Sequence, residues 1–175
     1  MPEALHPIVR RVVTGTDGEG RSVVAHDGPC DAVAPRPDGS QVMDVWRMPA
    51  VPPRLLDGDG LVGGVAGPDL GGLVYRLCWV APNDDMDAAA YARALADTYG
   101  DGAVAGAASG MVGGHATESV DVVTVVRGRL TAVLEAEEVE LGPGDSLVQR
   151  GTVHAWRNRT DEPVLMVALM VGAAR

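Results

Sequence analysis

The second half of the chain contains a series of short apolar runs bounded by turn residues, and this regular spacing limits the possible folds most strongly. The runs are rich in valine, whose branched side chain suits a pleated strand. Short strands at regular intervals favour an all-β barrel or sandwich. The expected strands in this part of the chain are 120–126, 130–134, 139–141, 146–149, 153–157 and 164–171.

The last of these runs, Val164 to Val171, is apolar in both of its alternation phases. Successive side chains of a strand point to opposite faces, so we expect both faces of this strand to be covered. One face should line the barrel interior. The other should meet a second sheet, the N-terminal segments or a second copy of the chain, and we expect a homodimer.

The first 72 residues are interpreted as an N-terminal extension of strands and loops. The first two expected strands flank the turn signal Gly15 to Gly20 and could form a hairpin with a longer loop. Residues 27–40 are rich in proline, aspartate and glycine, which predicts a loop. Residues 57–72 are either a mobile loop or a weak strand. The expected strands of the extension are 8–14, 21–26 and 41–48.

Residues 73–172 are expected to form the barrel core, beginning with a strand at Leu73–Ala81. One short helix is predicted at about 84–99, because Asn83 to Asp85 offer N-caps and Gly100 offers a stop. The glycine-rich stretch that follows, within 84–114, is either a lid or a long connection. The length of 175 residues is typical of one domain, so 1–175 is interpreted as a single domain.

The charge and composition of the chain argue against several classes of function. The net charge is −10, and the longest basic cluster is Arg10-Arg11, which disfavours nucleic acid and anionic membranes as partners. All fourteen basic residues are arginine, so pyridoxal phosphate (PLP) has no lysine to attach to. No phosphate-binding loop is present, so we expect no nucleotide cofactor.

The location of the protein is expected to be cytoplasmic. The N-terminus has no secretory signal pattern, and no apolar run approaches the ~20 residues that a membrane helix requires. Cys30 and Cys78 are the only cysteines, and we expect both to be free thiols.

Polar side chains share one alternation phase on two of the expected strands. His115, Thr117, Ser119 and Asp121 lie in one phase of the earlier strand, and His154, Trp156 and Asn158 share a phase on the later one. If both faces look into the barrel, His115, Asp121 and His154 converge as two imidazoles and a carboxylate, the facial ligand set of non-haem Fe(II) sites. The alternative is that the opposite, valine-rich phase is buried and the histidines are structural.

These residues resemble the two motifs of the cupin superfamily. Thr117 stands where the family has its second histidine, and Asp121 replaces a glutamate that is one methylene longer. With these departures, either a metal binds to His115, Asp121 and His154, or the site has lost its metal. The first motif is matched by His115, Asp121 and Gly128, and the second by Gly144, Gly151, His154 and Asn158.

The resemblance implies a jelly-roll β-barrel and a small-molecule enzyme, for instance one of secondary metabolism. Its chemistry would be that of an oxygenase or of an isomerase, cyclase or lyase. A divalent metal (Fe, Mn, Ni or Zn) would bind to His115, Asp121 and His154, which would also be the catalytic residues. A metal-free cupin is the alternative, acting either by His/Asp acid–base chemistry or as a non-catalytic binding module. The expected substrate pocket consists of Thr117, Ser119, Trp156, Asn158 and Trp79.

Overall fold

The computed structural model describes residues 9–55, 61, 64–105 and 110–174. These residues form mostly antiparallel strands, with two short helices between the fifth and sixth strands. The elements are β1 (Arg10–Thr16), β2 (Ser22–Pro29), β3 (Val33–Pro35), β4 (Gln41–Met48), β5 (Leu73–Val80), α1 (Ala88–Tyr99), α2 (Asp101–Ala105), β6 (Ser119–Arg127), β7 (Leu130–Leu134), β8 (Glu138–Leu141), β9 (Ser146–Arg150), β10 (His154–Arg157) and β11 (Val164–Gly172).

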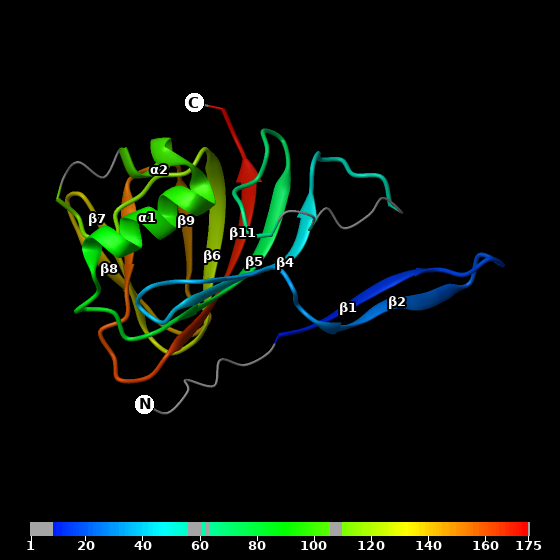
Figure 1. Ribbon diagram of the computed structural model, residues 1–175, viewed down its shortest axis with the longest axis horizontal. Helices are drawn as coiled ribbons and strands as arrows, with labels where there is room; N and C mark the ends of the chain where they lie inside the picture. The colour runs from blue at the N-terminus through cyan, green and yellow to red at the C-terminus, as the bar shows by residue number, and fades with distance from the viewer. Residues whose placement is uncertain (1–8, 56–60, 62–63, 106–109, 175) are drawn as a thin grey trace.

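Two sheets form the barrel, as the sequence predicts (Figure 1). The larger sheet has the strand order β3-β4-β5-β11-β6-β9, and the smaller has the order β10-β7-β8. Side chains from both sheets meet in one apolar cluster, for example Val125 and Val164 from the larger sheet and Leu130 and Leu141 from the smaller. The chain has no phenylalanine, so valine, leucine, methionine and alanine fill this core.

The expected N-terminal hairpin is present and stands apart from the barrel. Strands β1 and β2 pair with each other as a separate two-stranded sheet, with a bulge after Val13. The hairpin projects away from the body as an arm (Figure 1). Its apolar side chains are largely exposed, since Val12 is 49% and Val24 is 59% accessible.

Two elements lie where the sequence predicts irregular structure. Strand β3 falls inside the expected loop 27–40, because three residues pair with the edge of β4, a run too short to stand out in the sequence. Helix α2 falls inside the glycine-rich stretch, and its buried Ala103 accepts a hydrogen bond from the backbone N–H of Ala116. Residues 106–109 of that stretch lie outside the described residues, so the lid remains a prediction.

Helix α1 forms where the caps predict it. The Asp87 carboxylate accepts hydrogen bonds from the backbone N–H groups of Ala89 and Ala90, and Gly100, at φ 83°, ends the helix. Tyr91, Leu95 and Tyr99 are spaced four residues apart, so they share one face of the helix. That face covers the barrel interior, where all three side chains line a cavity. Within the described residues, no helix is long and apolar enough to cross a membrane.

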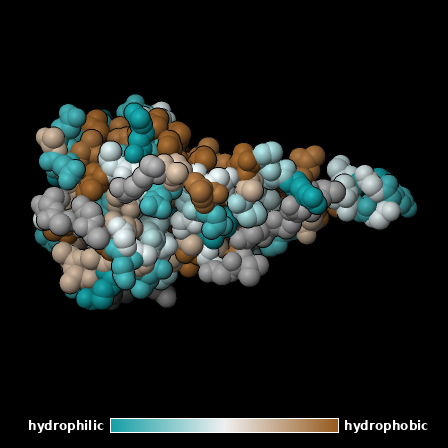
Figure 2. Space-filling view, turned by 90° about the horizontal axis from the view of Figure 1, so that it is seen from above, coloured by the Kyte–Doolittle hydropathy of each residue, from teal (hydrophilic) through white to brown (hydrophobic). Residues whose placement is uncertain are grey.

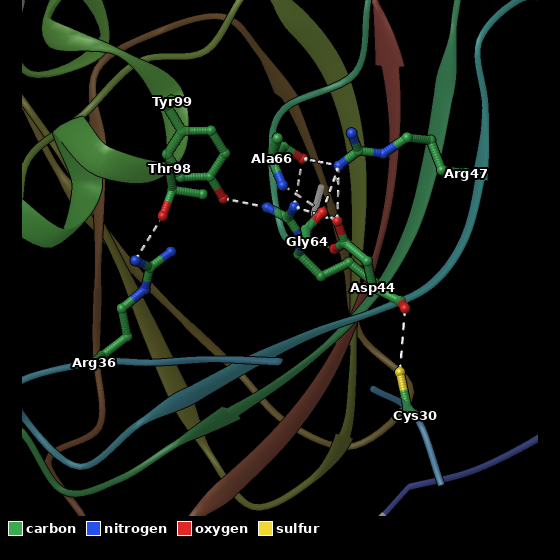
Figure 3. A network of polar contacts seen from close by, with 9 residues as sticks. Cys30, Arg36, Asp44, Arg47, Gly64, Ala66, Thr98 and Tyr99 are labelled. Carbon is green, nitrogen blue, oxygen red and sulfur yellow. Dashed lines mark hydrogen bonds and ion pairs between the residues drawn. The ribbon is translucent and has the colours of Figure 1, made fainter. Parts of the chain in front are cut away.

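A buried ion pair connects α1 to the larger sheet (Figure 3). The Arg76 guanidinium on β5 donates to both carboxylate oxygens of Asp44 on β4, at 2.6 and 3.1 Å, and both side chains are almost fully buried. Arg76 also donates to the backbone oxygen of Ala66 at 2.6 Å and to the Tyr99 hydroxyl at the end of α1. Arg47 adds a second donor to Asp44 at 3.1 Å.

The outer face of the larger sheet is apolar. Figure 2 shows hydrophobic residues gathered along one side of the body. The hairpin arm points away from the body, and the smaller sheet packs on the inner face, so neither covers these positions. The outward positions on the three central strands are Leu73, Tyr75 and Leu77 on β5, Leu165, Val167, Leu169 and Val171 on β11, and Val120, Val122, Thr124 and Val126 on β6.

The expected homodimer remains a prediction, and this face is where we expect the two copies to meet. Val122→Asp should shift the protein from dimer to monomer in sedimentation equilibrium, because a carboxylate would lose its water in the interface. Val24→Asp, on the hairpin arm, is the matched control and should leave the dimer intact. A monomeric wild-type protein, or a dimeric Val122→Asp variant, would contradict this prediction.

Removal of the charge at Asp44 should destabilise the fold strongly. Asp44→Asn leaves the Arg76 guanidinium buried without its counter-ion, which typically costs about 3–5 kcal/mol of unfolding free energy. Urea denaturation followed by circular dichroism measures this loss. Asp27→Asn removes the exposed ion pair with Arg10 and should change stability little, since solvent screens that pair. Equal effects of the two substitutions would show that the buried pair has no special role.

Candidate functional site

A cavity of about 60 Å³ lies inside the barrel, beneath α1. Its wall combines apolar side chains such as Val123 and Met166 with several charged and titratable groups. One water needs roughly 10–15 Å³ of such space, so the cavity has room for a few waters or a very small molecule.

Two histidines lie side by side in the wall of this cavity. His115 and His154 pair as an isolated antiparallel bridge, with two reciprocal backbone hydrogen bonds of 2.9 Å. Their ring centroids lie 4.4 Å apart at an angle of 45°. The two strands therefore bring together imidazoles that are 39 positions apart in the sequence. The polar phase of β6 faces inward, so the valine-rich phase is the outer one.

The His115 ring is fixed by the backbone and kept neutral by burial. Its Nδ1 lies 3.1 Å from the carbonyl oxygen of Gly113, so Nδ1 carries the hydrogen and donates it. The other nitrogen, Nε2, then has a free lone pair. Burial, together with the neighbouring His154, lowers the pKa of His115 to about 3. The uncharged imidazole is the form that accepts a proton or binds a metal.

The His154 ring has two neighbours at Nδ1. One is the carbonyl oxygen of Thr152 at 3.0 Å, and the other is the side-chain amide nitrogen of Gln149. Donation to the carbonyl leaves a lone pair on Nε2, whereas acceptance from the amide leaves a hydrogen there. Gln149 therefore influences which tautomer His154 adopts. Burial lowers the pKa of His154, so this ring is also neutral at pH 7.

Asp121 lines the same cavity with one carboxylate oxygen unsatisfied. Its Oδ2 accepts a long hydrogen bond of 3.4 Å from the Thr117 hydroxyl, to which the Ser119 hydroxyl donates at 2.9 Å. Its Oδ1 is buried and has no hydrogen-bond partner among the described residues. Burial raises the pKa of Asp121, while the Ser119 and Thr117 hydroxyls oppose that shift.

The donor groups fit a metal only in part. The two neutral imidazoles suit a divalent ion, and donation from Nδ1 to a backbone carbonyl is the arrangement that orients histidine ligands in metal sites. However, no three His, Cys, Asp or Glu side chains in the described parts of the chain lie together in a group that could hold an ion. The predicted set of His115, Asp121 and His154 is thus brought to one cavity without being assembled as a ligand set.

Aromatic rings extend the histidine pair on both sides. Tyr99 of α1 stacks on His115, with centroids 5.7 Å apart and planes 16° apart. Trp156 meets His154 edge-on at 5.5 Å. Because Arg76 holds the Tyr99 hydroxyl, the buried ion pair also sets the position of the ring that covers His115.

The remaining predicted pocket residues divide into two groups. Thr117, Trp156 and Trp79 line the cavity, although Trp79 lies in the same alternation phase of β5 as the exposed Tyr75. Ser119 is buried beside Thr117 and is not part of the cavity wall.

Asn158 also lies outside the cavity wall, and its polar groups make structural hydrogen bonds. It is fully buried, and its side-chain amide donates to the backbone oxygens of Val80 and Glu162. Its side-chain oxygen accepts from Thr160, which fixes the turn before β11. The geometry therefore gives Asn158 a role in the barrel wall and offers no contact with a substrate.

Six further polar residues of the cavity wall are not predicted from the sequence: Arg36, Ser40, Gln41, Arg76, Tyr91 and Tyr99. The sequence does contain a signal for the burial of Arg76, because it is the only charged residue in the otherwise apolar strand β5. The two tyrosines lie on the covered face of a helix that the sequence does predict. Arg36 lies in a segment that the sequence predicts as loop, and no local pattern indicates that its side chain is buried.

Comparison with known proteins agrees with this architecture. The family model described as Cupin domain matches residues 104–171. Two curated proteins of Diaporthe leptostromiformis, Phomopsin biosynthesis cluster proteins C' and D, are 49% identical over 47 residues, which cover 26% of this chain and 25% of theirs. The match thus spans about a quarter of the length of these relatives.

Solved structures that match this chain share little sequence with it. A putative ethanolamine utilization protein from Salmonella typhimurium is 10% identical, with 97% of this chain and 100% of the other covered and a TM-score of 0.47. A Cupin 2 conserved barrel domain protein from Salinispora arenicola is 16% identical, with 80% and 82% covered and a TM-score of 0.42. Residues 104–171 of this chain therefore match the cupin family.

Proposed function

We propose that this protein is a small-molecule enzyme that works by proton transfer in the cavity beneath α1. The observation that carries the proposal is the pair of neutral histidines, 4.4 Å apart, inside a buried cavity. A positioned imidazole is the commonest general base, and such a group typically accelerates a reaction by about 10²–10⁴-fold.

The geometry assigns a role to each group. His115 Nε2 carries the lone pair that would accept a proton from the substrate, because Nδ1 is already committed to the Gly113 carbonyl. Burial lowers the pKa of His115 to about 3, so the imidazolium needs negative charge beside it in order to form. His154, beside His115 in the same wall, receives or returns a proton according to its tautomer. The Asp121 carboxylate lines the same cavity and would stabilise the positive charge of an imidazolium. This arrangement suits isomerisation, dehydration or cyclisation of a small carbonyl compound.

The partial relatives support small-molecule chemistry. Both are named for a biosynthesis cluster, and they share about half of their residues with this chain over the matched stretch. We infer that this chain, too, acts in secondary metabolism.

A divalent metal on His115, Asp121 and His154 is the second form of the proposal. The unsatisfied Oδ1 of Asp121 and the carbonyl-anchored imidazoles favour it. The described residues do not bring the carboxylate and both imidazoles into one ligand group, so we place this form second. Such a metal would supply Lewis-acid or oxygen chemistry.

Elemental analysis of untagged protein, purified without chelator, separates the two forms. Near-stoichiometric Fe, Mn, Ni or Zn that is lost in Asp121→Asn and in His154→Asn would support the metal form. If the wild-type protein holds no metal, even after loading with each ion, the metal form is excluded and the proton-transfer form stands.

The proton-transfer form is tested by deuterium exchange of carbonyl compounds. A panel of small ketones and keto acids in D₂O is followed by ¹H NMR for loss of the signals of protons next to the carbonyl. The variant His115→Asn/His154→Asn should exchange at least about 100-fold more slowly than wild type, since both bases are removed. His26→Asn, on the hairpin arm, is the matched control and should keep the full rate.

Two outcomes would contradict proton transfer by the histidine pair. Full exchange activity in the double variant would place the chemistry elsewhere. Binding of panel compounds without exchange or turnover would identify the protein as a binding module that uses the same cavity.

A further inference from the structure

Two arginines reach the cavity wall although the chain as a whole is strongly acidic. Arg36 is 7% and Arg76 is 1% accessible, whereas the net charge of the chain is −10. A buried guanidinium is costly unless it is paired, because it has given up its hydration. The partners of each arginine therefore indicate whether its charge is already matched.

The charge of Arg76 is matched within the protein. Its Nε and one terminal nitrogen donate to the Asp44 carboxylate, and the other terminal nitrogen donates to the Tyr99 hydroxyl. The backbone oxygen of Ala66 accepts a further bond at 2.6 Å. Each of the three nitrogens of this guanidinium therefore has a hydrogen-bond partner, so Arg76 is a structural residue of the cavity wall.

The charge of Arg36 is not matched in this way. Its bonds to other side chains and to α1 all come from one terminal nitrogen, which donates to the Ala94 carbonyl and to the Thr98 hydroxyl, both at 2.7 Å. Figure 3 shows the bond to Thr98. Both acceptors are neutral. Across the described part of the chain, no carboxylate lies within ion-pair distance of Arg36.

Tyr91, on the covered face of α1, lies close to Arg36. The two residues line the same cavity, and two opposite charges act on the Tyr91 hydroxyl: the Asp38 carboxylate, which raises its pKa, and the Arg36 guanidinium, which lowers it by less. Within the described segments, that hydroxyl makes no hydrogen bond to another residue. Burial raises the pKa of Tyr91, so the hydroxyl keeps its proton and remains a donor at neutral pH.

From these contacts we infer that Arg36 and Tyr91 form an anion subsite, and that the cavity takes a small carboxylic acid. A guanidinium without a carboxylate partner and a nearby hydroxyl are the kind of donors that a carboxylate accepts from. The carboxylate would supply the counter-charge that Arg36 lacks. The remainder of the ligand would extend through the same cavity toward His115 and His154. This inference rests on the proposed function, because it names the substrate class of that site.

The inference is tested with pyruvate as the probe and pyruvamide as its uncharged counterpart. Binding to the full-length protein is followed by protein-observed NMR titration. Wild type should bind pyruvate at least about 10-fold more tightly than pyruvamide, since hydrogen bonds to a charged group are among the strong ones. Arg36→Met should abolish this preference, and Tyr91→Phe should reduce it.

A matched variant separates anion binding from the attachment of Arg36 to α1. Thr98→Val removes one of the two acceptors of Arg36 but keeps its charge, so it should retain the preference for pyruvate. Circular dichroism and thermal unfolding establish that each variant is folded. If Arg36→Met does not fold, Arg36→Lys takes its place. Lysine keeps the positive charge but lacks the planar, forked guanidinium, so this variant should bind pyruvate more weakly than wild type.

Several outcomes would overturn the anion subsite. These are equal binding of pyruvate and pyruvamide, a preference that survives in Arg36→Met, or no binding of pyruvate or other two- to six-carbon carboxylates by wild type. The proposed function fails separately. If carboxylates bind in a way that depends on Arg36 but no deuterium exchange occurs, the proposed enzymatic function is excluded and the anion subsite stands. If exchange occurs and does not depend on Arg36, the anion subsite is excluded and the proposed function stands.

Discussion

The buried pair of Asp44 and Arg76 is the interaction on which the rest of the site depends. It joins two neighbouring strands of the larger sheet, holds the backbone at Ala66, and reaches across the barrel to Tyr99. Tyr99 in turn stacks on His115, so one ion pair positions both the helix that covers the cavity and a ring at its centre. Two charges are stable here because each keeps several hydrogen bonds after leaving water.

The sequence predicts the barrel well because its strands obey simple alternation. Residues such as Val123 and Val125 share a phase with Asp121, and the structure buries all three on the inner face. The signals that fail are those that depend on distant contacts. Strand β3 exists only because β4 offers it an edge, and α2 forms in a glycine-rich segment because Ala103 packs into the body of the protein.

The candidate site shows the same division. The meeting of His115 and His154 follows from motifs that the chain displays, and the backbone bridge between them accounts for it. Arg36 and Tyr91 reach the same cavity from a loop and a helix that are far from those motifs, so no spacing rule links them. Asn158 belongs to the motif, and its side-chain amide donates to backbone oxygens of the barrel wall.

The central claim is that two buried, neutral histidines lie side by side in the wall of a cavity covered by α1. The most direct measurement is a pH series of ¹H–¹⁵N spectra of the imidazole groups in uniformly ¹⁵N-labelled protein, from pH 8 to pH 5. We expect His115, whose pKa burial lowers to about 3, to stay neutral throughout with the nitrogen shifts of a single tautomer, and His154 to take up its proton below its ordinary pKa. Protonation of all four near pH 6.5 would show that the histidine pair is open to water and would contradict the account.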